Sequence, residues 1–232
     1  MNISKIKKPL ILGILFFLPV IFLLFLYPST HNYNALDIVK ENVLDISESN
    51  LENNITVLGF LGENPIDNAI MALNLKELIY DKFRGFKKFQ VVLIVSEGTQ
   101  EQVKLLKQEL YQYEELKYWH FVYANETDIK KMFNSLSAEK GLSANLSTNN
   151  VFIIDTELNQ RGRLDERTGK EKEKNAPVYG LSSYDCIRIS EIKNKMSEDL
   201  RILFTEYRQK RKGTFDSASR RAEDIKPKDE QN

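Results

Sequence analysis

The feature that most constrains the fold is an alternation of apolar runs with amphipathic segments from Ile55 onward. Ile55–Phe60 and Gln90–Val95 are near-continuous apolar runs, which are typical of strands covered on both faces. Between them, Pro65–Phe83 places apolar residues at helical spacing. Strands that alternate with helices predict a three-layer α/β/α sandwich around a mostly parallel sheet.

The rest of this region continues the alternation and closes with a strand pair, which makes the expected sheet a mixed one. The last helix is the clearest amphipath, because its apolar residues recur every three or four positions up to Tyr207. The further expected elements are a short first strand at Leu36–Val39, a helix after Thr99, strands at Trp119–Tyr123 and Val151–Ile154, a helix at Thr127–Leu136, a strand at Gly162–Leu164 and a helix at Ile189–Tyr207.

An uncharged segment, Pro9–Tyr27, precedes the α/β region. As a helix it would be roughly 28 Å long, close to a bilayer core of about 30 Å. Lys5, Lys7 and Lys8 stand before it, so the positive-inside rule predicts a cytoplasmic N-terminus and an extracytoplasmic (periplasmic) domain. A cleaved signal peptide is the alternative, although no A-x-A-like site follows the segment.

These observations predict a single-pass protein of the inner (cytoplasmic) membrane. Its parts are a cytoplasmic N-terminus (1–8), an anchor (9–27), a spacer with the short first strand (28–54), the folded domain (55–211) and a disordered charged tail (212–232). Lys plus Arg and Asp plus Glu both number 33, so the net charge gives no argument for a nucleic-acid partner.

The chain has one cysteine, Cys186, which excludes an internal disulfide and a Cys-x-x-Cys zinc half-site. We expect a small buried side chain; the alternative is a thiol activated by nearby Arg188. No phosphate-binding glycine loop, nucleophile elbow or His-Glu-x-x-His motif occurs. The chain is therefore not expected to be an enzyme, and no cofactor is expected.

The order of elements over about residues 50–211 resembles the thioredoxin superfamily, and in particular membrane-anchored envelope proteins of the Sco/SenC type. Gly59-Phe60 followed by Asn64-Pro65 looks like the family's strand–loop–helix stretch. Val151–Asp155, the Gly162-Arg163 pair and Glu206–Arg208 look like its later strands and last helix. The chain also resembles bacterial proteins labelled only "membrane or secreted protein".

The departures from that family lie at its reactive positions. Alignment on the proline puts the two family cysteines at Asn64 and Asn68, and the family histidine near Ser147. The proline before the fourth strand is replaced by Thr148-Asn149-Asn150. Asparagine forms neither a thiolate nor a strong copper(I) site. The resemblance therefore implies a degenerate site, with no catalytic and no metal-binding residue.

Two groups of residues are candidate binding sites. In the first, backbone N–H groups at a helix N-terminus could hold an anion, unless Asn64 is only a helix cap. The second is a mixed-charge cluster that is either a solvated turn or a contact patch for a protein. The candidate binding loop is Asn64, Pro65, Asp67 and Asn68, and the candidate interaction patch is Arg161, Arg163, Asp165, Glu166 and Arg167.

Neither histidine predicts a metal site. His120 alternates with Trp119 and Phe121 in an expected strand, which indicates a structural role, and His31 follows the anchor. A copper site made of His120, Met132 and Cys186 has no support from their spacing. The favoured function is a non-catalytic, membrane-tethered module that binds a protein. The alternatives are a metal or redox protein with unusual ligands and a small-ligand binder at Asn64–Asn68.

Overall fold

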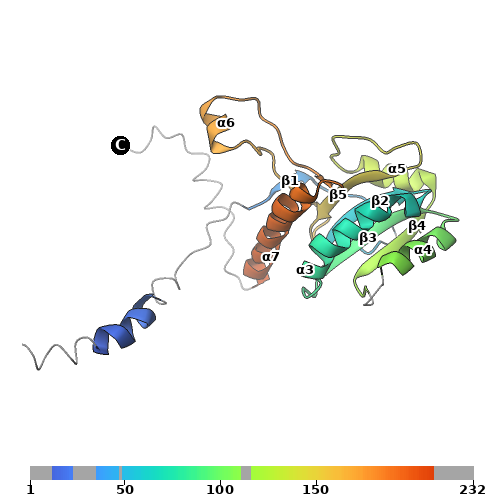
Figure 1. Ribbon diagram of the computed structural model, residues 1–232. Coiled ribbons are helices and arrows are strands. Elements are labelled where there is room, and N and C mark those ends of the chain that lie inside the picture. Colours follow the sequence, from blue (N-terminus) through green and yellow to red (C-terminus); the bar gives the residue numbers. More distant parts are fainter. Residues whose placement is uncertain (1–11, 23–34, 47–48, 111–115, 212–232) are drawn as a thin grey trace, which may run out of the picture. The chain divides into compact units, whose positions relative to one another are not determined.

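The computed structural model describes residues 12–22, 35–46, 49–110 and 116–211, and the chain divides into two compact units, 1–34 and 35–232 (Figure 1). The described part of the first unit is a helix at 12–22. Within the described residues, no helix combines the length and apolar character needed to cross a bilayer. The rest of the expected anchor, His31 and the tail after Arg211 lie outside the described residues.

The second unit is built on a seven-stranded sheet in the order β1-β6-β5-β2-β3-β4, with β7 paired to β5. The strands are β1 (Asp37–Lys40), β2 (Ile55–Gly62), β3 (Phe89–Ser96), β4 (Trp119–Ala124), β5 (Thr148–Ile154), β6 (Gln160–Gly162) and β7 (Tyr184–Asp185). All eight residues of β2 are buried, as expected for a central strand covered on both faces. The predicted strands are therefore present, with ends that differ by a few residues.

The sheet is mixed, but the expectation of a mostly parallel sheet is wrong. Only two of the pairings between neighbouring strands, β2–β3 and β3–β4, are parallel. The pairings β1–β6, β2–β5, β5–β6 and β5–β7 are antiparallel. The sequence pattern missed this because buried strands look alike in either direction. It also missed that β1 lies within the folded unit, beside β6.

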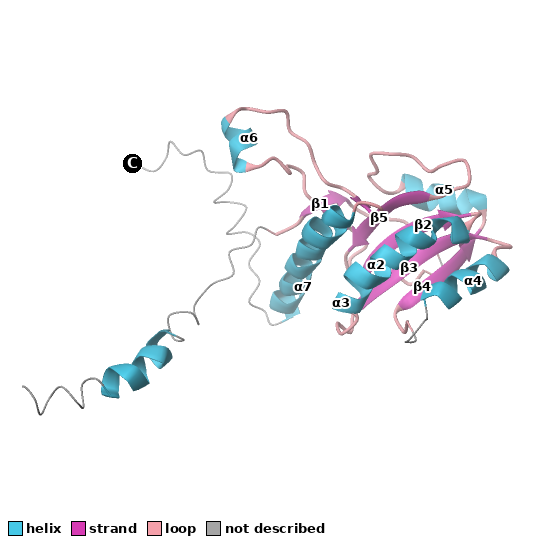
Figure 2. Ribbon diagram, viewed as in Figure 1, coloured by secondary structure: helices cyan, strands magenta, loops and turns pink. Residues whose placement is uncertain are grey.

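Helices cover both faces of the sheet (Figure 2). On one face, α2, α4 and α7 pack against Val57, Val91 and Val151; on the other, α5 packs against Leu58, Val92 and Phe152. The helical segments are η1 (Pro65–Asn68), α2 (Ala69–Leu75), η2 (Lys76–Tyr80), α3 (Asp81–Phe83), α4 (Gln100–Leu110), α5 (Glu126–Asn134), α6 (Gly169–Glu173), η3 (Glu191–Met196) and α7 (Ser197–Arg211).

The helix predicted at Pro65–Phe83 is not uniform. It begins as a 3-10 turn, η1, continues as α2, widens to the π-helical η2 and ends in α3. The final helix likewise starts with a π-helical stretch, η3, before α7. Periodicity predicts which residues face the core, but it does not distinguish these close variants of the helix.

Candidate functional site

The loop that follows β2 lies directly against the segment that precedes β5. Gly62 has a φ of +63°, and a Cβ there would lie 1.9 Å from the Asn145 carbonyl oxygen. The Glu63 backbone N–H donates to that same oxygen at 2.9 Å. Only glycine fits this conformation and this approach. The fold thus brings together the two segments that carry the reactive groups in the family that the sequence resembles.

Polar groups of the Asn64–Asn68 turn form hydrogen bonds with the backbone of the turn and of β2. The Asn68 side-chain amide donates to the Leu61 and Asn64 carbonyl oxygens, both at 3.2 Å. The Asp67 backbone N–H also donates to the Asn64 oxygen at 3.2 Å. Asn64 occupies the N-cap position of η1, as expected, but its side chain makes no capping hydrogen bond. Asn68 closes the turn instead.

The other two residues of the candidate loop, Pro65 and Asp67, lie in the same turn. Pro65 is buried at the first position of η1, where its missing N–H costs nothing. Asp67 is exposed in the same turn. Because η1 is a single 3-10 turn, and the Asp67 and Ala69 N–H groups donate to backbone oxygens of the turn, it offers little of the expected anion site.

The facing segment is also closed by its own hydrogen bonds. The Ser143 hydroxyl donates to the Ser147 carbonyl oxygen at 2.8 Å, and the Ser147 hydroxyl donates to Asn145 Oδ1 at 2.8 Å. Leu146 between them has a φ of +61°, which completes the turn. Ser147, at the position of the family histidine, therefore holds a loop in shape.

Cys186 is a core residue, as expected. It is fully buried, and its backbone N–H donates to the Asn149 oxygen at 2.9 Å. Its carbonyl oxygen accepts from the Asn74 side chain at 2.9 Å, which ties the segment after β7 to α2. Burial, with smaller contributions from Asp185 and Glu191, raises the pKa of the thiol far above its usual value. The thiol is therefore protonated and shielded at neutral pH.

The candidate interaction patch does not form one surface. Arg161 is only 4% exposed and lies between two buried carboxylates, Asp155 at 3.0 Å and Glu206 at 2.7 Å. It also donates to the Leu36 oxygen at 2.8 Å, while its Nε has no hydrogen-bond partner. Arg161 thus ties β6 to α7 and to the start of β1, and its inclusion in a surface patch is wrong.

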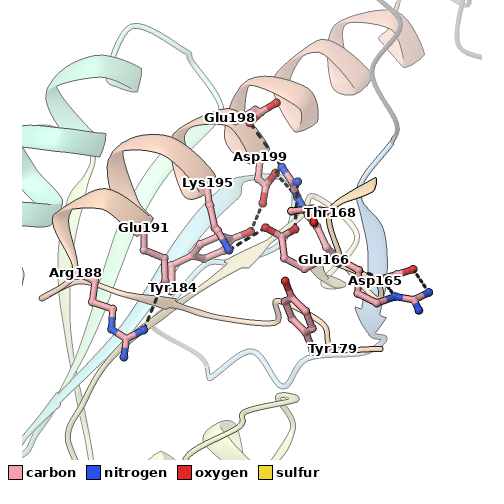
Figure 3. A network of polar contacts seen from close by, with 12 residues as sticks. Asp165, Glu166, Thr168, Tyr179, Tyr184, Arg188, Glu191, Lys195, Glu198 and Asp199 are labelled. Carbon is pink, nitrogen blue, oxygen red and sulfur yellow. Dashed lines mark hydrogen bonds and ion pairs between the residues drawn. The ribbon is translucent and has the colours of Figure 1, made fainter. Parts of the chain in front are cut away.

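Arg163 binds a third buried carboxylate, that of Asp199. Its Nε lies 2.9 Å from Asp199 Oδ1, and a second nitrogen contacts the same oxygen. The Tyr184 hydroxyl donates to Asp199 Oδ2 at 2.7 Å (Figure 3). Asp199 is fully buried, and this burial raises the pKa of its carboxyl group even though Arg163 and Tyr184 act to lower it. The arginine is thereby fixed to the first turn of α7.

Glu166 extends this network to the segment that follows β6. Its carboxylate accepts from Arg163 at 3.2 Å and lies 2.9 Å from Lys195 Nζ. Its backbone N–H donates to the Tyr179 oxygen at 2.8 Å, and Arg163 pairs with Leu181 in a short antiparallel bridge. These contacts clamp both ends of residues 164–180, which we call the arm.

The arm has its own internal order. Arg167 forms a two-bond pair with Asp165, with both N–O distances at 2.9 Å, and donates to the Ala176 oxygen at 2.8 Å. Arg167 lowers the pKa of the Asp165 carboxyl group. Thr168 and Glu171 form a capping box at the start of α6. The arm therefore contains a short helix, α6.

Three large apolar side chains of the arm are exposed. Leu164 is 57%, Val178 63% and Tyr179 46% exposed. They were not predicted as a surface, because this segment stands out in the sequence only as a charge cluster. The signal was available: isolated apolar residues within a charged segment have no neighbouring apolar period with which to form a core face.

The histidine and methionine of the hypothetical copper site do not meet the cysteine. Met132 belongs to the core on the α5 face of the sheet, and Cys186 to the core on the α2 face. His120 is exposed on β4. Among the described residues, no three side chains of His, Cys, Asp or Glu are placed to share a metal ion.

The strand order and connections define the class of fold. A parallel β2–β3 pair joined by helices, an antiparallel β5–β6 hairpin beside β2 and a final helix α7 make a thioredoxin-like α/β fold with a mixed sheet. Here β4 is added beyond β3, and β1 beyond β6.

No protein-family model and no curated protein matches the sequence. Among solved structures, the chain is similar to a thiol:disulfide interchange protein from Bacteroides sp. (15% identity, 56% of this chain and 75% of that chain, TM-score 0.33). It is also similar to the soluble domain of Sco1 from Bacillus subtilis (10%, 64% and 78%, 0.35) and to copper-bound ScoI of Arabidopsis thaliana (16%, 66% and 87%, 0.35). Because these TM-scores are low, the fold assignment rests on the strand order and pairing.

Proposed function

We propose that this chain is a non-catalytic thioredoxin-like module that binds a protein partner through the arm, residues 164–180. The observation that carries the proposal is that the arm is held in place yet exposes apolar side chains. Its ends are clamped by Arg163, Glu166 and Lys195, whereas Leu164, Val178 and Tyr179 present apolar surface to solvent. Exposed apolar side chains on a held segment suit protein binding, because less entropy is lost on association.

The chemistry of the residues at the two candidate positions supports a non-catalytic role. The junction after β2 has Asn64 and Asn68 where a thiol mechanism needs thiolates, and the Asn68 amide is engaged with the backbone. The one thiol, Cys186, lies in the core with a raised pKa. The hydroxyl groups of Ser143 and Ser147 in the facing segment form hydrogen bonds within their own loop.

We further propose that residues 9–27 hold the module at a membrane, with the folded unit on the extracytoplasmic side. Support comes from the sequence: the segment has no charged residue, and Lys5, Lys7 and Lys8 flank one end. The test is carbonate extraction of membranes from cells that express the full chain. Retention in the pellet supports the anchor, and release into the supernatant contradicts it.

The arm is tested by quantitative pull-down from native membranes with the tagged full chain. Val178→Asp puts a charge at an exposed apolar position of the arm, so we expect loss of the captured partner without loss of folding. Leu44→Asp is the matched control, because Leu44 is an exposed apolar residue (41%) outside the arm. A partner that both variants retain, or that both lose, would contradict the assignment to the arm.

A further inference from the structure

Strand β4 is the outermost strand on one side of the sheet, and no described strand pairs with its outer edge. The Val91 N–H donates to the Tyr118 oxygen at 2.8 Å, and the Glu97 N–H donates to the Ala124 oxygen at 3.1 Å. In a parallel ladder, alternate residues bond to the neighbour, so His120, Val122 and Ala124 face β3. The N–H and C=O groups of Phe121 and Tyr123 therefore point outward, and no described strand pairs with them.

This edge lacks the features that usually prevent pairing. Trp119–Ala124 contains no proline and no Lys, Arg, Asp or Glu, and its register with β3 is unbroken. Natural edge strands are normally interrupted by charges, prolines or bulges. An uninterrupted edge of six residues is long enough to accept a further strand.

Two lysines stand near the first half of this edge. Lys107 of α4 places its Nζ 5.3 Å from the centre of the Phe121 ring, and Lys117 lies 5.3 Å from that of Tyr118. Both ammonium groups therefore stand beside the outer strand (Figure 2 shows α4 next to β4). A partner strand with carboxylates would meet these charges, whereas a basic one would be repelled.

A cavity of about 340 Å³ adjoins the same strand. Its lining is mostly polar and includes Lys107, His120 and Gln90. Trp119 and Phe121 also line it, and the Lys107 ammonium group in this lining favours a ligand that carries a carboxylate.

We propose that the β4 edge binds an extended acidic polypeptide, which adds an outer strand and places a carboxylate beside Lys107. Backbone hydrogen bonds to Phe121 and Tyr123 give affinity, and the lysines select for acidic side chains. A second copy of this chain fits less well, because antiparallel pairing about Phe121 would bring the two Lys107 side chains together. The β4 edge is a separate surface from the arm, so a negative result at one of them does not contradict the proposal for the other.

The test is amide hydrogen exchange by NMR on the full-length protein, with and without a blocked peptide of four Val-Glu repeats. We expect exchange at Phe121 and Tyr123 to slow about tenfold or more, with His120 and Val122 unchanged because they already bond to β3. A peptide of four Val-Lys repeats and a Val-Glu peptide N-methylated at alternate residues should give no protection. Equal protection by the basic peptide would overturn the acidic assignment.

Lys107→Glu should weaken binding of the acidic peptide roughly three- to tenfold, since attraction becomes repulsion. Lys104→Glu is the matched control on the same helix, because Lys104 is well exposed and pairs with Glu101 at 3.8 Å. The proposal is overturned if the acidic peptide protects neither Phe121 nor Tyr123 at millimolar concentration. It is also overturned if protection rises with protein concentration alone, which would identify a second copy as the occupant.

Discussion

The Tyr184 hydroxyl donates to the Asp199 carboxylate across 2.7 Å inside the protein, and this bond joins β7 to the first turn of α7. Both residues are fully buried. Arg163 shares the carboxylate from the other side, so the buried charge has a counter-charge and a hydrogen-bond donor. A buried charge that loses one of its partners destabilises a fold strongly.

Tyr184→Phe should therefore lower the free energy of unfolding by about 1.5–3 kcal/mol, since it removes a buried hydrogen bond to a charged group. Urea unfolding followed by circular dichroism measures the change. Tyr179→Phe removes an exposed hydroxyl that donates to Glu171, so its effect should be much smaller. Equal effects of the two variants would mean that the Tyr184–Asp199 bond does not stabilise the fold.

Arg161→Ala should cost about 3–5 kcal/mol, because it leaves the buried Asp155 carboxylate without its cation and Glu206 with Lys210 alone. The expected readout is a large drop in melting temperature. Arg188→Ala is the comparison: the Arg188 side chain is 69% exposed, and its ion pairs should contribute at most about 1 kcal/mol. A small effect at Arg161 would argue against the buried triad.

The raised pKa of Asp199 sets the sign of a pH dependence. Between the ordinary aspartate pKa and the raised one, the folded state binds more protons at this group than the unfolded state does. Its contribution to stability therefore falls as the pH rises through this interval and is constant above it. Urea unfolding of the wild-type protein and Asp199→Asn over the acid range should show their stability difference moving in this direction. Movement in the opposite direction would mean that Arg163 dominates over burial.

Gly62→Ala should destabilise the protein by about 1–3 kcal/mol, because the new Cβ meets the Asn145 oxygen and the residue keeps a positive φ. Gly98→Ala is matched in backbone conformation, with a φ of +85°, but its Cβ would meet nothing within 4 Å. We expect a cost of about 1 kcal/mol there, from backbone strain alone. Chemical denaturation of both variants separates the clash from the strain.

Cys186 should react with a thiol reagent such as DTNB only as fast as the protein opens, because the thiol is buried and its pKa is raised. The rate in folded protein should be at least about a hundredfold below that in urea. Cys186→Ala should leave binding of the arm partner unchanged. Rapid modification of the folded protein would revive the alternative of a reactive or metal-binding thiol.

Much of the fold was predictable from the sequence, because burial on a face imposes a local period. The apolar run at Ile55–Phe60 predicted β2, and the recurring apolar residues up to Tyr207 predicted the last helix. The direction of β5 was not predictable, since a buried strand has the same pattern whichever way it runs. The π-helical stretches were missed because each has only 5 or 6 residues, too few to change the apolar period visibly.

The sequence by itself determined the chemistry at the junction after β2: Asn64 and Asn68 are not thiols, whatever structure surrounds them. Only the tertiary structure decided how the neighbouring polar residues are used. Arg161 and Arg163 are two positions apart in one charged stretch, yet Arg161 pairs with Glu206 and Arg163 with Asp199, both on α7. Such partners are distant along the chain, and local pattern carries no information about which distant carboxylate packing will bring to each guanidinium.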